Sequence, residues 1–432
     1  MRSALFLILA LPAAASDALP TANAVFPELE MESVELGQLL FYDPILSGNR
    51  NISCGTCHHP TLGTADGVSL GIGEGGGGLG IERKADHDNH PEERIPRNAP
   101  ALWNLGASEF TVMFHDGRVE ADESQPYGVR TPLGEEMVDG FKSVLAAQAM
   151  FPVLSADEMA GQYSENDVAK AVRMGQNSQE GGAWDILATR VAQIPEYRAR
   201  FDNVIGPETP IKYVDIANAL ADFIAFEWRS DESDFDRHLR GEAPLEGEAL
   251  AGMELFYGEA NCSTCHSGQF QTDHDFHAIA MPQLGPGKRA AFEDHARDTG
   301  RMGVTGRLED AYAFRTPSLR NLSVTAPYGH AGSYSSLRDV VEHHYYPVAA
   351  LENYAQELAL LPKFDGADDW RIHLDSREVA EIAAASKLMP SNALTDADTD
   401  AILAFLASLE DTRDGKGRLG IPDSVPSGLP LD

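Results

Sequence analysis

The sequence predicts a mainly α-helical chain that folds as two domains with long loops. Alternation of apolar and polar residues with a period of two is scarce, while glycine (39 residues) and proline (25 residues) are frequent. This pattern favours helices joined by loops over sheets. With 432 residues, the chain exceeds the size at which one hydrophobic core stops growing. A short cysteine motif also occurs once in each half of the chain, which favours two domains.

The N-terminal residues predict an export signal. Met1 and Arg2 form a short basic region, an apolar stretch follows from Ala4, and small residues near Ala15 suit cleavage. We therefore expect residues 1–16 to be a signal peptide and the mature protein to lie in the periplasm. The apolar stretch is short for a membrane span and no later segment approaches the required length, so no membrane span is expected.

The acidic composition excludes some partners. The chain has 33 Lys and Arg residues against 67 Asp and Glu residues, which gives a formal net charge of −34. Nucleic acid would be repelled by this charge, so no nucleic-acid partner is expected. The acidic residues are spread along the chain, which indicates a solvated surface; steering of a basic redox partner is the alternative.

All four cysteines lie in two pentads, Cys54-Gly-Thr-Cys57-His58 and Cys262-Ser-Thr-Cys265-His266. Two thiols at this spacing can add to the two vinyl groups of a haem, and the adjacent imidazole reaches the iron. Disulfides, a zinc site or a thioredoxin-like redox pair are rival interpretations. Each of them leaves the two histidines without a role. We expect two covalently bound haem c groups and two cytochrome c-like haem domains.

The order of elements supports a duplicated architecture. Leu39-Leu-Phe-Tyr42 precedes the first pentad, and Glu254-Leu-Phe-Tyr257 precedes the second. Apolar residues recur at helical spacing from Ile211 to Ile224 and from Leu250 to Phe256. The acidic, glycine-containing link 230–241 lies between these two helices. We therefore predict one haem domain at 17–229 and a second at 242–410.

Three further segments have a predicted conformation. The run Gly71–Gly80 is expected to be a flexible loop, because a phosphate cradle would also need the lysine and hydroxyl of a P-loop. Thr395 is a predicted N-cap with Asp398 at the third helical position. Apolar residues from Ile402 to Leu409 share one face of that helix, which we expect to close the second haem pocket. Residues 411–432 are expected to form an extended tail.

Several motifs follow one another in a specific order between Leu36 and Leu409. They are Arg97-Asn-Ala-Pro100, Phe114-His-Asp-Gly-Arg118, Gln148 to Met159, Phe314-Arg-Thr-Pro-Ser-Leu-Arg-Asn321 and Thr325-Ala-Pro-Tyr-Gly-His330. With the pentads, these motifs resemble the bacterial di-haem cytochrome c peroxidase family, which also contains the MauG-type enzymes that oxidise residues of a partner protein. The resemblance implies that the first haem meets peroxide and that the second stores and relays electrons.

The resemblance also implies a set of site residues for the first haem. The distal pocket of the family matches Gln148, Pro152 and Glu158 in identity and spacing. A carboxyl near the iron can move a proton between the two oxygens of peroxide while an amide holds it. We expect Glu158 to be the general acid and base and Gln148 to assist it. The alternative is that both are helix and loop surface residues.

A calcium ion between the domains is implied in the same way. The corresponding ligands are Asn98, Thr325 and Pro327. Hard oxygen ligands suit calcium, and several waters would complete the coordination shell. A turn-forming role for Asn98-Ala-Pro is the competing explanation.

The chain departs from the family pattern at the second haem. The peroxidases have a distal methionine fourteen residues after the histidine that corresponds to His330, and MauG-type enzymes have a tyrosine in this neighbourhood. The same count here reaches His344, with His343 and Tyr345 as one-residue alternatives. An imidazole in this position would remove the raised potential that methionine gives.

A second departure concerns the region between the haems. The family places a tryptophan immediately before Asp-Gly-Arg, and this chain has His115 there. Imidazole is a poorer hole carrier than indole. Trp103 is a candidate to substitute, with a buried packing role as its alternative.

Together these observations predict a periplasmic di-haem c-type peroxidase. It would reduce hydrogen peroxide with electrons from a small donor, a cytochrome c or a cupredoxin. A MauG-type oxidase that modifies aromatic residues of a partner protein is the first alternative. A non-enzymatic electron carrier is the second, and Gln148 and Glu158 argue against it because a carrier needs no proton shuttle. The sequence leaves open whether the protein forms a homodimer.

Overall fold

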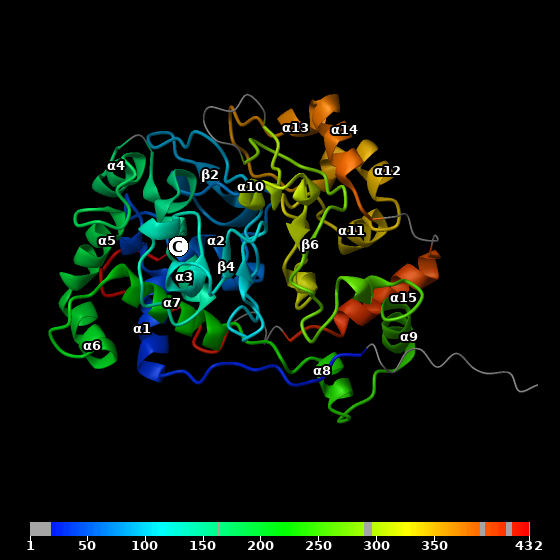
Figure 1. Ribbon diagram of the computed structural model, residues 1–432, viewed down its shortest axis with the longest axis horizontal. Coiled ribbons are helices and arrows are strands. Elements are labelled where there is room, and N and C mark those ends of the chain that lie inside the picture. Colours follow the sequence, from blue (N-terminus) through cyan, green and yellow to red (C-terminus); the bar gives the residue numbers. More distant parts are fainter. Residues whose placement is uncertain (1–18, 163, 289–295, 389–393, 412–416, 432) are drawn as a thin grey trace, which may run out of the picture.

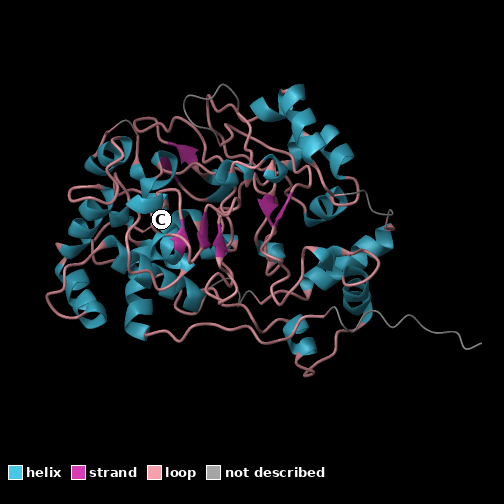
Figure 2. Cartoon of the chain, viewed as in Figure 1, coloured by secondary structure: helices cyan, strands magenta, loops and turns pink. Residues whose placement is uncertain are grey.

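The computed structural model describes residues 19–162, 164–288, 296–388, 394–411 and 417–431. The predicted signal peptide, residues 1–16, lies outside these ranges. The described chain forms two helical lobes with a few short strands near the middle (Figures 1 and 2), which confirms the prediction of a mainly α-helical chain. No helix among these residues combines the length and the apolar character that a bilayer crossing requires.

Helices α1–α7 form the first lobe, α8 lies in the link, and α9–α15 form the second lobe (Figure 1). Many of these helices are short, and long loops connect them. In chain order they are α1 (Met31–Tyr42), α2 (Cys54–Cys57), α3 (Val144–Gln148), α4 (Asp167–Arg173), α5 (Ala183–Ala192), α6 (Pro195–Ile205), α7 (Tyr213–Glu227), α8 (Asp234–Leu239), α9 (Gly247–Phe256), α10 (Met302–Thr305), α11 (Leu337–His343), α12 (Pro347–Glu352), α13 (Arg371–Leu374), α14 (Ser376–Ala385) and α15 (Asp396–Ala407).

The strands are two or three residues long and pair antiparallel. Strand β1 pairs with β2, β6 pairs with β7, and β3, β4 and β5 form a sheet in that order. Such short ladders fix loops locally rather than provide a core. The strands are β1 (Gly76–Gly77), β2 (Lys84–Ala85), β3 (Val112–Met113), β4 (Val119–Ala121), β5 (Val129–Arg130), β6 (Phe276–His277) and β7 (Phe314–Arg315).

The two lobes repeat one helix pair, which supports the internal duplication. Helix α1 packs against α7, and α9 packs against α15. Each pair touches at a glycine. A Cβ atom on Gly37 of α1 would collide with the carbonyl of Ala219, and one on Gly252 of α9 would collide with the carbonyl of Ala401. The first helix of each pair leads directly toward a pentad.

The hydrophobic cores of the lobes differ. Buried apolar residues of the first lobe form one continuous cluster, which includes most of α1 and α7. Those of the second lobe fall into three smaller clusters: one around α9 and α15, one around α14, and one in which Met281 and Tyr334 pack with Leu70 of the first lobe. The second lobe therefore depends less on one apolar core than the first.

The predicted helix near the C-terminus begins as expected. The Thr395 hydroxyl accepts the N–H of Asp398 at 3.2 Å, and the Asp398 carboxylate accepts the N–H of Thr395 at 2.9 Å. This reciprocal cap starts α15 at Asp396. The capping prediction is confirmed.

The expectation of a flexible loop at the glycine run is wrong for its first half. The segment from Gly71 to Gly75 is buried, and β1 then pairs with β2. The Arg83 guanidinium donates hydrogen bonds to the carbonyls of Gly73 and Gly78, at 2.7 Å each. The glycines here allow close packing, as the site described below requires.

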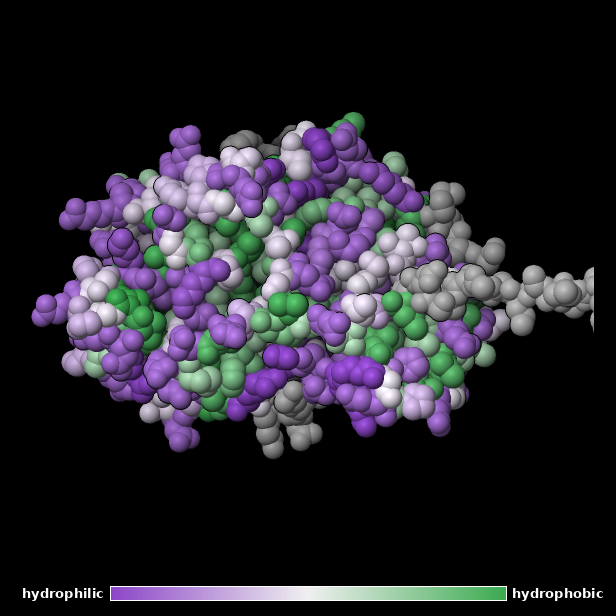
Figure 3. Space-filling view, turned by 60° about the horizontal axis from the view of Figure 1, so that its bottom comes forward, coloured by the Kyte–Doolittle hydropathy of each residue, from purple (hydrophilic) through white to green (hydrophobic). Residues whose placement is uncertain are grey.

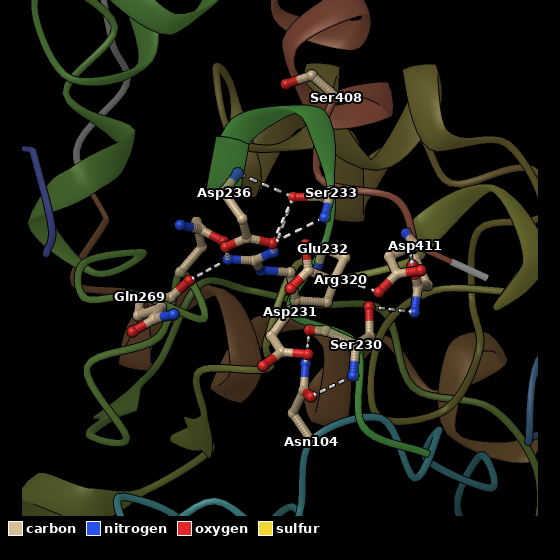
Figure 4. Close-up of polar contacts among 12 residues, drawn as sticks. Asn104, Ser230, Asp231, Glu232, Ser233, Asp236, Gln269, Arg320, Ser408 and Asp411 are labelled. Carbon is tan, nitrogen blue, oxygen red and sulfur yellow. Dashed lines mark hydrogen bonds and ion pairs between the residues drawn. The ribbon is translucent and has the colours of Figure 1, made fainter. Parts of the chain in front are cut away.

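The predicted link 230–241 is tied to both lobes (Figure 4). Ser230 and Asn104 of the first lobe exchange two hydrogen bonds of 2.7 and 2.8 Å. On the other side, Asp236 of α8 forms a fully buried ion pair with Arg320, at 2.6 Å. Arg320 also donates to the carbonyl of Gln269, at 2.5 Å, in the loop after the second pentad. The domain boundary stays a prediction, but the link is fixed to both lobes by these contacts.

Both ends of the described chain cross between the lobes. The segment before α1 runs along one edge of the molecule (Figure 1), with Leu19 against the core around α9 and Phe26 against the core of the first lobe. The tail returns from α15 to the first lobe. There Glu227 accepts the N–H groups of residues 418–420 at 2.7 to 2.9 Å, and Val425 joins the core. The tail is extended, as predicted, but it is packed.

Hydrophilic residues are spread over the face that Figure 3 shows, and apolar residues lie between them in smaller groups. This distribution agrees with the sequence, in which acidic residues occur throughout the chain.

Candidate haem sites and peroxide pocket

The first pentad forms a short helix in the first lobe. Ser53 and Thr56 make a capping box that begins α2 at Cys54. Cys54 and Cys57 are free thiols, and burial raises the pKa of each to about 12. The Nδ1 atom of His58 lies 2.9 Å from the carbonyl oxygen of Thr64. The ring also interacts with the backbone carbonyl of Pro100. These contacts orient the ring, and Nε2 is the nitrogen that would bind a metal.

The second pentad has the same arrangement in the second lobe. It begins with a tight turn over Cys262–Thr264, and its two cysteines are also free thiols. The Nδ1 atom of His266 lies 3.0 Å from the carbonyl oxygen of Gln271. Each pentad thus offers two thiols and one oriented imidazole nitrogen, the set that covalent haem requires.

A second imidazole faces that of His266. The ring centroids of His266 and His344 are 6.4 Å apart, with 60° between the ring planes. Two metal–nitrogen bonds of about 2 Å, together with the inner halves of both rings, span about this distance. The Nδ1 atom of His344 lies 2.7 Å from the carbonyl of Val340, so its Nε2 is the nitrogen left for a ligand bond. The pair fits an iron between two imidazoles.

The two alternatives for this ligand have other partners. His343 uses both ring nitrogens, with Nδ1 2.9 Å from the Tyr334 hydroxyl and Nε2 2.8 Å from the carbonyl of Ile279. The Tyr345 hydroxyl lies 3.2 Å from that of Thr399. The geometry therefore favours His344 of the three.

A carboxyl group, that of Glu158, interacts with the first pentad. Glu158 lies on a π-helical turn, Ala156–Ala160, and its charge contributes to the raised pKa of Cys57. Burial raises the pKa of Glu158, and the positive charges of Arg118 and Lys288 oppose that shift. The adjacent Asp157 has a pKa raised to about 7, mainly by burial. A raised pKa makes a carboxyl a better proton acceptor than an ordinary glutamate.

The other residues of the predicted pocket lie on neighbouring turns. Gln148 is the last residue of α3 and is half-buried. Pro152 opens the short turn Pro152–Leu154, which packs against the turn of Glu158. Arg118 stacks on Phe114, with its guanidinium carbon 3.4 Å from the ring centroid. The motifs that are separate in sequence thus converge on one region of the first lobe.

His115 and Trp103 lie at the contact between the lobes. The Nε2 atom of His115 lies 3.1 Å from the carbonyl of Asn98, and its pKa is lowered to about 4 by burial, so the ring is neutral. Trp103 is buried and donates to the carbonyl of Gly63 at 3.0 Å. A Cβ atom on Gly63 would collide with the carbonyl of Val324 in the second lobe. Trp103 therefore contacts the loop after the first pentad at the point where this loop packs against the second lobe.

The predicted calcium ligands come from adjoining segments. The backbone N–H of Asn98 donates to the carbonyl of His330 at 2.9 Å, and its side-chain amide donates to Val68 at 2.8 Å. This holds Asn98 against the segment that contains Thr325 and Pro327. Calcium binding at these residues stays a prediction.

A buried ion-pair cluster joins the lobes, and sequence reasoning missed it. Arg97 pairs with Asp298 through two bonds of 2.6 and 2.8 Å and with Asp116 at 2.7 Å. These contacts hold the pKa of Asp298 at about 2. Arg97 and Asp116 belong to motifs noted above, but no local pattern marks Asp298, which lies in the other half of the chain.

Comparison with known proteins gives one consistent result. A family profile described as di-haem cytochrome c peroxidase matches residues 31–244. The methylamine utilization protein MauG of Methylorubrum extorquens is 32% identical over 75% of this chain and 70% of its own length. The cytochrome c551 peroxidase of Nitrosomonas europaea is 29% identical over 76% of this chain and 77% of its own length.

Two solved structures share the fold. The diheme peroxidase BthA from Burkholderia thailandensis superposes with a TM-score of 0.58 at 21% identity, covering 94% of this chain and 91% of that one. A MauG-like protein associated with microbial copper homeostasis gives a TM-score of 0.57 at 23% identity, covering 94% and 96%. At these identities the likeness concerns the fold alone.

Proposed function

This chain belongs to the di-haem cytochrome c peroxidase family, and on that premise we propose that it reduces hydrogen peroxide to water with electrons from a small redox donor. Members of the family are haem-dependent oxidoreductases, and the family implies two c-type haems. One observation carries the proposal: an imidazole faces the histidine of the second pentad, whereas a carboxyl with a raised pKa interacts with Cys57 of the first pentad.

The residues that would hold the two haems follow from the pentads. Cys54 and Cys57 would form the thioether links of the first haem, and His58 would bind its iron. Cys262, Cys265 and His266 would do the same for the second. Haem c bound by these residues would supply a redox-active iron. His344 would provide a second imidazole for the iron that His266 binds.

Glu158 and Gln148 would perform the proton chemistry. Reduction of one peroxide takes two electrons and two protons and yields two waters. The Glu158 carboxylate accepts the proton from one peroxide oxygen and returns it to the other, which then leaves as water. The Gln148 amide holds the peroxide in place. Burial raises the pKa of Glu158, which brings the carboxyl closer to the range where it can both accept and donate.

Two observations favour a MauG-type oxidase as the second candidate. A relative at 32% identity carries that name, and His344 stands where the peroxidases have methionine. In this case the electrons would come from aromatic side chains of a partner protein instead of a small cytochrome or cupredoxin.

Further parts of the proposal concern location and metal content. We place the mature enzyme in the periplasm, on the basis of the predicted signal at residues 1–16. A calcium ion at Asn98, Thr325 and Pro327 would stabilise the contact between the lobes.

The test uses the chain loaded with both haems. Glu158→Gln removes the proton shuttle at nearly constant volume, and we expect the rate constant with hydrogen peroxide to fall by about 10²- to 10⁴-fold. The control is Glu227→Gln, a buried glutamate of the same lobe whose partners are the N–H groups of the tail. A wild-type rate in Glu158→Gln would refute the proposal.

Two further measurements separate the function classes. Carbon monoxide binding to the reduced protein indicates an open iron, and its absence would indicate a pure electron carrier. Peroxide turnover with a reduced small cytochrome supports the peroxidase. Turnover that occurs only with a protein substrate supports the MauG-type oxidase.

A further inference from the structure

The turn that carries Glu158 is held from outside by neighbouring segments. The backbone N–H of Glu74 lies 3.2 Å from the carbonyl oxygen of Asp157 and 3.1 Å from that of Glu158. The N–H of Gly48 donates to the carbonyl of Met159 at 2.8 Å. The Asn166 amide donates to the carbonyl of Ala160 at 3.0 Å. Four consecutive carbonyls therefore have partners outside the turn.

Two glycines allow this close approach. A Cβ atom on Gly73 would collide with the carbonyl of Asp157, and one on Gly48 would collide with the carbonyl of Ala160. The buried first half of the glycine run thus lies directly against the turn. Its packing places the N–H of Glu74 beneath the carbonyls of Asp157 and Glu158.

The Glu74 side chain is anchored in an unusual way. It is 1% exposed, and one carboxylate oxygen, Oε1, accepts the side-chain amides of Asn49, Asn51 and Asn89 at 2.8 Å each. No ion pair of Glu74 with a cation occurs among the described residues. A buried carboxylate without hydrogen bonds is strongly destabilising, so the three amides stabilise Glu74 in this position.

We propose that Glu74 is a positioning residue for Glu158. Its carboxylate, held by Asn49, Asn51 and Asn89, locks the glycine segment so that the Glu74 N–H fixes the turn and, through it, the direction of the Glu158 carboxyl. This inference rests on the proposed role of Glu158 as the proton shuttle. It assigns a role to the glycine run and to three asparagines that the pentads and distal residues leave unexplained.

The expected size of the effect follows from the geometry. Loss of the Glu74 anchor frees two of the four carbonyl contacts, while those from Gly48 and Asn166 remain. The turn would then shift rather than unfold. A displacement of about 1 Å at a reacting group costs about 10²-fold in rate, so a fall of about 10- to 100-fold is expected.

The test compares Glu74→Ala with Glu74→Gln in the chain loaded with both haems. The rate constant with hydrogen peroxide is measured across pH. In Glu74→Ala we expect the fall in rate given above. We also expect the limb of the pH–rate profile that reports the ionisation of Glu158 to shift to lower pH, because a loosened turn admits water and lowers the raised pKa of Glu158. Glutamine keeps one oxygen acceptor for the amides, so Glu74→Gln should restore the rate and the limb.

The matched control is Glu227→Ala, which also removes a buried glutamate that binds backbone N–H groups, but far along the chain in α7. It should lower the melting temperature and leave the pH limb in place. If Glu74→Ala does not fold, Asn89→Ala removes one of the three donors from Glu74, and a smaller shift of the limb in the same direction supports the proposal.

The outcomes separate this inference from the proposed function. A wild-type pH profile in Glu74→Ala or, failing that, in Asn89→Ala, together with a strong loss in Glu158→Gln, overturns the positioning role alone. Equal losses in Glu74→Gln and Glu74→Ala also overturn it, because the acceptor oxygen would then be irrelevant. A wild-type rate in Glu158→Gln overturns the proposed function itself.

Discussion

In both halves of the chain, the pentad histidine directs its Nδ1 toward a backbone carbonyl a few residues on, that of Thr64 in the first lobe and Gln271 in the second. The surroundings of the two pentads differ. His266 faces the ring of His344 at 6.4 Å, whereas the carboxyl of Glu158 interacts with Cys57 of the first pentad. The repeated unit thus keeps its two thiols and its oriented imidazole, and the residues around it differ between the lobes.

The interiors of the two lobes are also stabilised by different contacts. The first has one continuous apolar core, and the second has three small clusters together with buried polar links such as Arg320–Asp236. A small core gains proportionately more from a bound cofactor. The second lobe should therefore depend more on its haem and on its charged contacts than the first.

Removal of the attachment cysteines is expected to have the largest effect. The double variant Cys262→Ala/Cys265→Ala should lose one of the two haems, and amide exchange should accelerate across the second lobe because its apolar clusters are small. The variant Cys54→Ala/Cys57→Ala should also lose one haem but keep protection in α5 and α6, which belong to the continuous core. Haem content is measured by absorbance and protection by hydrogen exchange. Equal loss of protection in both lobes would contradict the comparison.

Replacement of the opposite imidazole should change the second haem alone. In His344→Met the reduction potential of that haem should rise by a part of the ~0.8 V range that axial ligands cover, and the low-spin bis-imidazole EPR signal should disappear. The control is His343→Phe, whose native ring bonds Tyr334 and Ile279. It should lose stability and keep the signal. An unchanged potential in His344→Met would remove His344 as the ligand.

The buried ion pair gives the smallest of the three effects. Arg320→Met leaves Asp236 buried without its partner, which should lower the free energy of unfolding by about 3–5 kcal/mol. Arg240 lies in the same link and pairs with Glu242 at the surface, with side chains 26% and 52% exposed. Arg240→Met should cost less than about 1 kcal/mol. Urea denaturation of both variants checks the difference, and equal costs would show that the second lobe does not need its buried charges.

Much of the fold could be predicted because its signals are local. The pentads, the repeated lead-in helix and the Thr395 cap are each contained in a short stretch of sequence. The prediction of a flexible loop at the glycine run was wrong for its first half because glycine has two structural effects. It makes a solvent-exposed chain flexible, and it allows two backbone segments to approach closely. Only the structure shows that Gly73 lies against the carbonyl of Asp157.

The site was less predictable where partners are distant in sequence. The count from His330 reached His344 but left three candidates, and the contacts of His343 and Tyr345 are what distinguish them. The pairing of Arg97 with Asp298 joins the two halves of the chain. Glu74 gives no signal in the sequence, because the role proposed for it depends on asparagines from two other loops.

The returning tail has a consequence for how the molecule is made. Val425 belongs to the core of the first lobe, and Glu227 binds residues 418–420. The lobe that emerges first during synthesis therefore lacks part of its interior until the second lobe has been translated. Contacts between such distant positions form slowly, so we expect the enzymes that attach haem to meet a chain whose first lobe is still open.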